Sequence, residues 1–110
     1  MSEWKEIAKL NDIPVRGARV IKTANGCIGI FRTHKNRVFA IDDACPHKKA
    51  SLSEGLVHGD AVTCPMHNWV IDLNSGKALG ADEGSVKTYK IKVENEIIYL
   101  DISRINDLKD

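Results

Sequence analysis

Two short segments of this 110-residue chain each carry a thiol and an imidazole. They are the first box, Cys45-Pro46-His47, and the second box, Cys64-Pro65-Met66-His67, with 16 residues between them. Two matched segments suggest one shared metal site, because thiolate and imidazole are both strong ligands for iron and zinc. Each proline fixes its own φ and pushes the preceding cysteine toward extended geometry, which stiffens the loop. The candidate ligands are Cys45, His47, Cys64 and His67.

An iron-sulfur cluster with two irons and two sulfides suits this mixed ligand set. Two thiolates neutralise the oxidised cluster, whereas four would leave it negative, so an electron is added more easily here. Mixed ligation raises the reduction potential to roughly −150 to +300 mV, against about −400 mV for all-cysteine plant-type clusters. Because protein ligands fill every available position, we expect electron transfer and no substrate site on this chain alone.

Zinc is the alternative occupant, since two cysteines and two histidines also satisfy tetrahedral zinc. A zinc-stabilised interaction module would have no redox role. Structural zinc sites usually pair their ligands as Cys-x-x-Cys and as spaced histidines. Mixed boxes of one cysteine and one histidine in a chain rich in strands favour the iron-sulfur interpretation.

The elements that must position these boxes are strands, because period-two alternation and tight-turn pairs dominate the chain. Asn25-Gly26 predicts a hairpin with a type I′ turn, and Lys35-Asn36 joins the next two strands. Gly59-Asp60 predicts a type II′ hairpin between the two boxes, which would bring them together. We expect one all-β domain over residues 1–110.

The C-terminal third predicts one further hairpin and a polar tail. A strand over Val86–Val93 would put Tyr89, Ile91 and Val93 on one face, and Glu94-Asn95 would turn it into Ile97–Ile102. Residues 103–110 are polar and predict a short helix or a frayed end.

The two boxes, on a chain of this length and pattern, resemble the Rieske domain, over nearly everything from Trp4 to Ile102. The resemblance implies three stacked antiparallel sheets, with a Rieske-type 2Fe-2S cluster between two loops at one tip. High-potential members add a disulfide between the loops, but Ala50 and Met66 stand at those positions here. They also carry a serine and a tyrosine that hydrogen-bond the cluster sulfurs, where this chain has Trp69 and Ile71. A low potential is therefore expected.

A more specific resemblance is to the small subunit of assimilatory NAD(P)H-dependent nitrite reductase. It rests on the runs Cys45-Pro46-His47-Lys48-Lys49-Ala50, Leu52-Ser53-Glu54-Gly55, Cys64-Pro65-Met66-His67-Asn68-Trp69, Ile71-Asp72-Leu73 and Asp82-Glu83-Gly84-Ser85-Val86-Lys87-Thr88-Tyr89. The resemblance implies an electron-transfer subunit of an oxidoreductase. Its partner would be a large flavin and sirohaem subunit that reduces nitrite to ammonium in nitrate assimilation.

The rival family is the Rieske ferredoxin of ring-hydroxylating dioxygenases, with the same fold and a similar first box. The run His67-Asn68-Trp69 and the segment Asp82-Glu83-Gly84 argue against it, since those ferredoxins more often have glycine after the second histidine. Lys48 and Lys49 follow a ligand, and either they dock an acidic partner or they are solvated loop residues.

Composition narrows the partners further. Sixteen basic residues against 15 acidic ones give no global field that would gather nucleic acid or a membrane. The first ten residues lack an uninterrupted apolar run, so we expect no signal peptide or anchor and a cytoplasmic location.

Four residues outside the ligand set carry expectations of their own. Cys27 is expected to be a buried thiol, and His34 and His58 are expected to face solvent near turns. Trp69 is expected to pack as core behind the cluster rather than to relay electrons.

Overall fold

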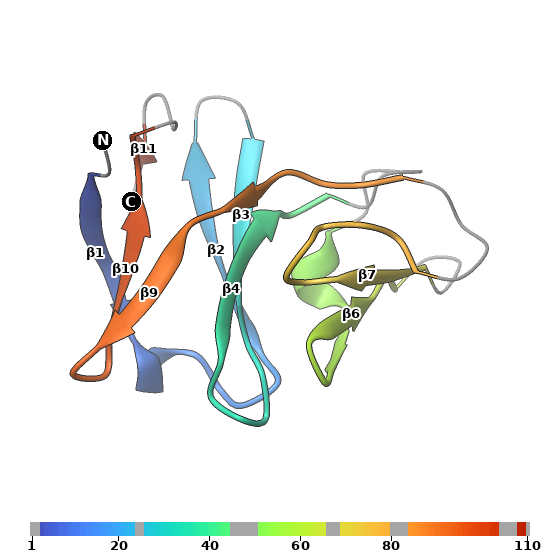
Figure 1. The fold of residues 1–110 in the computed structure, drawn as a ribbon, viewed down its shortest axis with the longest axis horizontal. Helices are drawn as coiled ribbons and strands as arrows, with labels where there is room; N and C mark the ends of the chain where they lie inside the picture. Colours follow the sequence, from blue (N-terminus) through green and yellow to red (C-terminus); the bar gives the residue numbers. More distant parts are fainter. Residues whose placement is uncertain are drawn as a thin grey trace.

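Three antiparallel sheets build the computed structural model, which describes residues 3–23, 26–44, 51–65, 69–79, 84–103 and 108–109 (Figure 1). The first sheet has the order β1 (Trp4–Lys9), β10 (Ile97–Asp101), β9 (Ile91–Glu94). The second has the order β11 (Leu108–Lys109), β2 (Ala18–Thr23), β3 (Gly26–Arg32), β4 (Val38–Asp42), β8 (Thr88–Tyr89). The third has the order β5 (Leu56–His58), β6 (Ala61–Thr63), β7 (Val70–Asp72). Two single-turn 3₁₀ helices, η1 (Leu10–Asp12) and η2 (Leu52–Glu54), complete the described elements and confirm the all-β prediction.

The second sheet is the middle layer, because both of its faces are buried. Successive residues of a strand point to opposite faces, so the apolar run in β3 serves two cores. Ile30 packs into the core shared with the first sheet, and Phe31 packs into the core shared with the third; both are fully buried. In β4, Ala40 packs into the core shared with the first sheet, and Ile41 packs into the core shared with the third. The third sheet is therefore held against the rest of the chain by an apolar core.

The hairpin between the boxes has the predicted turn. His58 pairs with Ala61, and Gly59 has a φ of +56° while Asp60 has no positive φ, as a type II′ turn requires. The N-terminal hairpin is displaced by one residue from its prediction. Gly26 already pairs with Thr23 inside β3, and Asn25 lies outside the described residues. The hairpin at Lys35-Asn36 is confirmed, since β3 and β4 pair on either side of it.

The predicted strand over Val86–Val93 is wrong as a single strand. Its first part, β8, pairs with β4, whereas β9 pairs with β10, so the chain leaves one sheet for another at Lys90 (Figure 1). The following turn is centred on Asn95 and Glu96, both with positive φ, one residue later than Glu94-Asn95. Apolar and polar residues still alternate through such a crossing, because the alternation depends on the face to which each side chain points. It does not depend on which strand is the hydrogen-bonding partner.

The prediction of a short helix or a frayed end at the C-terminus is also corrected. Leu108 and Lys109 form β11, which pairs with Thr23 and Lys22 at the edge of the middle sheet. Backbone hydrogen bonds make this pair, so a polar sequence gives little sign of it. Among the described residues there is no helix with the length and apolar character needed to span a membrane.

Candidate metal centre

The second box is the connection between β6 and β7. Thr63 and Val70 pair at its base, and the Cys64 backbone N–H donates to the Trp69 carbonyl at 2.6 Å. The Cys64 side chain is fully buried and forms no disulfide. Strand pairing and this hydrogen bond therefore hold both ends of the box and place a free thiol at the margin of the core.

The first box is closed by a carboxylate between its two ends. Asp43, which is only 8% exposed, accepts hydrogen bonds from the Ser53 backbone N–H at 2.6 Å and from the Ser53 hydroxyl at 2.7 Å. The Asp43 N–H in turn donates to the Cys27 carbonyl at 2.9 Å. The Asp43–Ser53 clamp ties the end of β4 to η2, so the residues on either side of the box are fixed.

Gly55, which follows η2, lies against Thr63, the residue before the second box. A Cβ atom added to Gly55 would lie well inside contact distance of the Thr63 carbonyl oxygen, one residue before Cys64. Leu52 and Cys64 share the core between the second and third sheets. Only glycine permits this approach of the two backbones, and it brings the segment after the first box against the residue before Cys64.

Of the four predicted ligands, Cys64 lies within the described residues, and Cys45, His47 and His67 lie outside them. The ligand set therefore remains a prediction. Its described part fits a cluster, because a buried, unpaired thiol stands where the two box-bearing segments converge. The positions of the absent disulfide, Ala50 and Met66, also lie outside the described residues, as do Lys48, Lys49 and the pair Asp82-Glu83.

Comparison with known proteins gives the family. Residues 3–101 match the family model described as Rieske-like [2Fe-2S] domain. The chain belongs to this Rieske family. It is a Rieske electron-transfer domain, and its cofactor is a 2Fe-2S cluster.

Curated relatives of this Rieske domain include ferredoxins of dioxygenase systems. It is 32% identical to the naphthalene 1,2-dioxygenase system ferredoxin component of Pseudomonas putida, over 92% of this chain and 97% of the relative. It is 41% identical to the 3-phenylpropionate/cinnamic acid dioxygenase ferredoxin subunit of Shigella boydii, over 83% of this chain and 86% of that protein.

Solved structures similar to this chain include proteins that are not dioxygenase ferredoxins. The E. coli protein NirD matches with a TM-score of 0.76 and 29% identity, covering 91% of this chain and 96% of NirD. A protein of Mycobacterium tuberculosis, described as the small subunit of an NADH-dependent nitrite reductase, matches with a TM-score of 0.79 and 19% identity. That match covers 91% of this chain and 95% of the other and shows the common fold.

Some of the other sequence predictions for the Rieske domain are confirmed, and one is wrong. His34 and His58 are exposed as expected, although His58 Nε2 lies 2.6 Å from the Thr63 hydroxyl. Trp69 is partly buried against the second core, which confirms its packing role. Cys27 is exposed, so the prediction of a buried thiol is wrong. Alternation puts it on the face opposite to Ile28, at the start of β3, where the core does not reach.

Two acidic residues of the site were missed. Asp43 forms the clamp, and Asp42 Oδ1 accepts a hydrogen bond from the Tyr89 hydroxyl at 2.6 Å. Partial burial, and then the hydrogen bond and negative charge of Asp42, hold the pKa of Tyr89 well above its usual value. The available signal was two adjacent carboxylates at the end of an apolar strand, directly before the first box.

Proposed function

We propose that this Rieske domain is the electron-carrying small subunit of an assimilatory NAD(P)H-dependent nitrite reductase, which reduces nitrite to ammonium. Its partner is then a large cytoplasmic subunit that carries flavin and sirohaem. The observation behind the proposal is the run Asp82–Tyr89 together with the second box and its following Asn68-Trp69. The 29% identity to NirD over nearly the whole chain supports it.

The described part of that run, residues 84–89, lies between the segment after β7 and the end of β4. The Val86 N–H donates to the Gly76 carbonyl at 2.7 Å, and the Asp42 N–H donates to the Lys87 carbonyl at 2.9 Å. The run therefore bridges the turn after β7 and β4, the strand that leads to the first box. The described residues of the run that carries this resemblance thus contact the strand that leads to the first box.

The chain's own residues set the conditions for electron transfer. When bound, the cluster supplies one-electron exchange and no open coordination position. Cys45, His47, Cys64 and His67 would hold it, and the Asp43–Ser53 clamp and the β6–β7 pairing orient the two loops. Trp69 packs against the core behind the second box, and Ile71 is fully buried and offers no side-chain donor.

The second candidate is the ferredoxin of a ring-hydroxylating dioxygenase. The observation in its favour is the 32% and 41% identity to curated ferredoxin components of such systems. The two candidates share the cofactor and differ in the protein that receives the electron.

Affinity capture separates them. The affinity-tagged holoprotein, isolated anaerobically from cells of its source grown on nitrite as the nitrogen source, is expected to bring down a large protein with a sirohaem absorption spectrum and bound flavin. Recovery of a small flavoprotein reductase or a non-haem oxygenase, with no sirohaem protein, would overturn the nitrite reductase proposal and favour the dioxygenase ferredoxin.

A further inference from the structure

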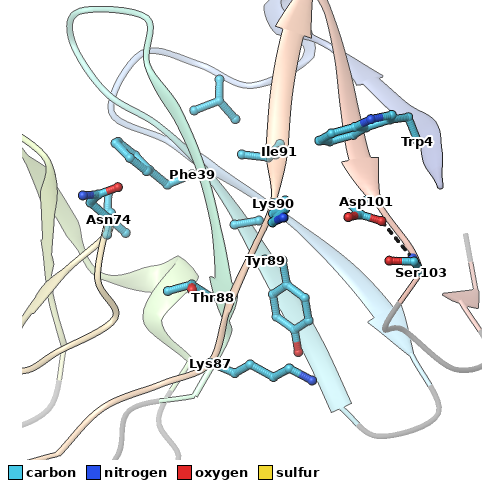
Figure 2. A pocket seen from close by; sticks show the side chains of 13 residues that line it. Trp4, Phe39, Asn74, Lys87, Thr88, Tyr89, Lys90, Ile91, Asp101 and Ser103 are labelled. Atoms are coloured by element: carbon cyan, nitrogen blue, oxygen red, sulfur yellow. Dashed lines mark hydrogen bonds between the residues drawn. The ribbon is translucent and has the colours of Figure 1, made fainter. Parts of the chain in front are cut away.

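An open groove of about 880 Å³ lies where the three sheets meet, on the side of β4 from which the chain departs at Lys90. Figure 2 shows Tyr89, Lys90 and Ile91 along the crossing strand, with Phe39 and Asn74 on one side and Trp4 and Asp101 on the other. We call this cavity the lysine groove; its defining residues are Trp4, Phe39, Leu73, Lys87, Tyr89 and Lys90.

Cations gather around the aromatic walls of the lysine groove. Lys87 Nζ lies 5.3 Å from the centroid of the Tyr89 ring, and the Arg37 guanidinium lies 5.2 Å from that of Phe39. Lys92 Nζ lies 4.6 Å from the Trp4 ring centroid. A cation over a ring keeps its charge available to a further anionic partner.

Two lysines of the lining, Lys87 and Lys90, have no carboxylate partner among the described residues. Arg37 pairs with Asp60 at 2.6 Å, and Lys92 with Glu94 at 3.5 Å, whereas Lys87 and Lys90 form no ion pair with a described carboxylate. The carboxylate in the lining, Asp101, accepts the backbone N–H groups of Glu3 and Ser103, both at 3.0 Å. The lysine groove is therefore cationic at the crossing strand and apolar beside it.

This combination suits an acidic, partly apolar polypeptide segment. Lys87 and Lys90 would attract its carboxylates, which speeds encounter and sets orientation. Phe39 and Ile91 line the groove and are only partly buried, so they offer apolar surface to a side chain of that segment.

The position of the lysine groove indicates which protein supplies that segment. Lys87 and Tyr89 belong to the run that carries the nitrite reductase resemblance, and Asp42 accepts the Tyr89 hydroxyl one residue before the clamp on the first box. We infer that the lysine groove binds an acidic segment of the large nitrite reductase subunit. The inference rests on the proposed function and adds the contact surface to it.

Charge reversal in the full-length holoprotein tests this inference. The double variant Lys87→Glu/Lys90→Glu is compared with Lys22→Glu/Lys35→Glu, which changes the net charge equally at exposed positions outside the groove. Affinity for the purified large subunit is measured at low and at physiological ionic strength. We expect the groove variant to bind about tenfold or more weakly and to lose most of the salt dependence, and the control pair to bind like the unmodified chain. Melting temperature and the reduced-state EPR signal show that both variants are folded and loaded.

The outcomes separate the two proposals. If the unmodified chain binds the large subunit and both variants bind equally well, or both weaken equally, the groove inference is wrong while the nitrite reductase role stands. If the unmodified chain does not bind a sirohaem flavoprotein at all, the proposed function fails and the inference fails with it.

Discussion

At the scale of single residues, two of the three cysteines stand in boxes with a histidine, and the third does not. Cys64 is buried at the meeting point of the two box-bearing segments, whereas Cys27 is exposed at the start of β3. We expect Cys64→Ser to lose cluster binding, because a hydroxyl does not replace a thiolate as an iron ligand. The iron content should fall from about two irons per chain to nearly none, as measured by metal analysis.

Cys27→Ser is the matched control for that substitution. It removes a thiol of the same kind at an exposed position and should leave the iron content and the EPR signal unchanged. Loss of iron in this variant, or its retention in Cys64→Ser, would contradict the ligand assignment. Zinc recovered in place of iron from anaerobically prepared protein would do so as well.

The residues at positions 69 and 71 set an expectation for the reduction potential. Trp69 and Ile71 stand where high-potential Rieske proteins have hydrogen-bond donors to the cluster sulfurs, and such bonds favour the more negative, reduced state. The potential should lie toward the lower end of roughly −150 to +300 mV. Protein-film voltammetry measures it directly, and a value well above zero would show that other donors reach the sulfurs.

Tyr89 gives the stability a dependence on alkaline pH. Its pKa is raised in the folded chain, first by burial and then by Asp42, whereas in the unfolded chain it ionises near pH 10. Below about pH 10 the contribution of Tyr89 is fully present, and it is lost as the pH rises further, because only the unfolded chain then releases the proton. Urea melts between about pH 8 and about pH 11 should show a shallower alkaline loss of stability for Tyr89→Phe than for the unmodified chain.

Tyr99→Phe is the control, since it removes a phenol whose hydroxyl has no part in the Asp42 contact. Both variants carry the same cluster, so its sensitivity to alkali cancels in the comparison. An alkaline loss in Tyr89→Phe as steep as in the unmodified chain would mean that the Asp42 contact does not govern this titration.

At the scale of elements, the Asp43–Ser53 clamp joins β4 to η2 across the first box. Ser53→Ala removes one of two hydrogen bonds to a nearly buried carboxylate, so we expect a loss of about 1–3 kcal/mol in the free energy of unfolding. The variant should also release iron faster on dilution into chelator, because the ends of the box are less well fixed. Denaturant melts and chelator kinetics measure the two effects.

Ser75→Ala provides the comparison, because the Ser75 hydroxyl also donates to a carboxylate, that of Asp72 at 2.9 Å, but at an exposed site. Its cost should stay within about 0.5 kcal/mol. Equal losses in the two variants would show that the clamp contributes no more than a surface hydrogen bond.

At the scale of the whole molecule, turn chemistry and alternation predict the hairpins well, and they predict the assembly of sheets less well. Gly59-Asp60 predicted both the turn and its type correctly, because the positive φ that a type II′ turn needs depends on the turn residues themselves. The crossing at Lys90 and the strand β11 depend on partners distant in sequence, which a local pattern does not encode. The candidate site shows the same division: ligand types and spacing mark the boxes, whereas the clamp at Asp43 and the close approach at Gly55 arise from tertiary packing.

The proposed function requires that this Rieske domain pass electrons from NAD(P)H toward nitrite through a large flavin and sirohaem subunit. The most direct test follows the cluster's visible and EPR signals in a stoichiometric anaerobic mixture with that subunit. We expect NAD(P)H to reduce the cluster within the time of turnover, and subsequent nitrite to reoxidise it with formation of ammonium. A cluster that stays oxidised with NAD(P)H, or stays reduced while the large subunit alone consumes nitrite at the full rate, would contradict the claim.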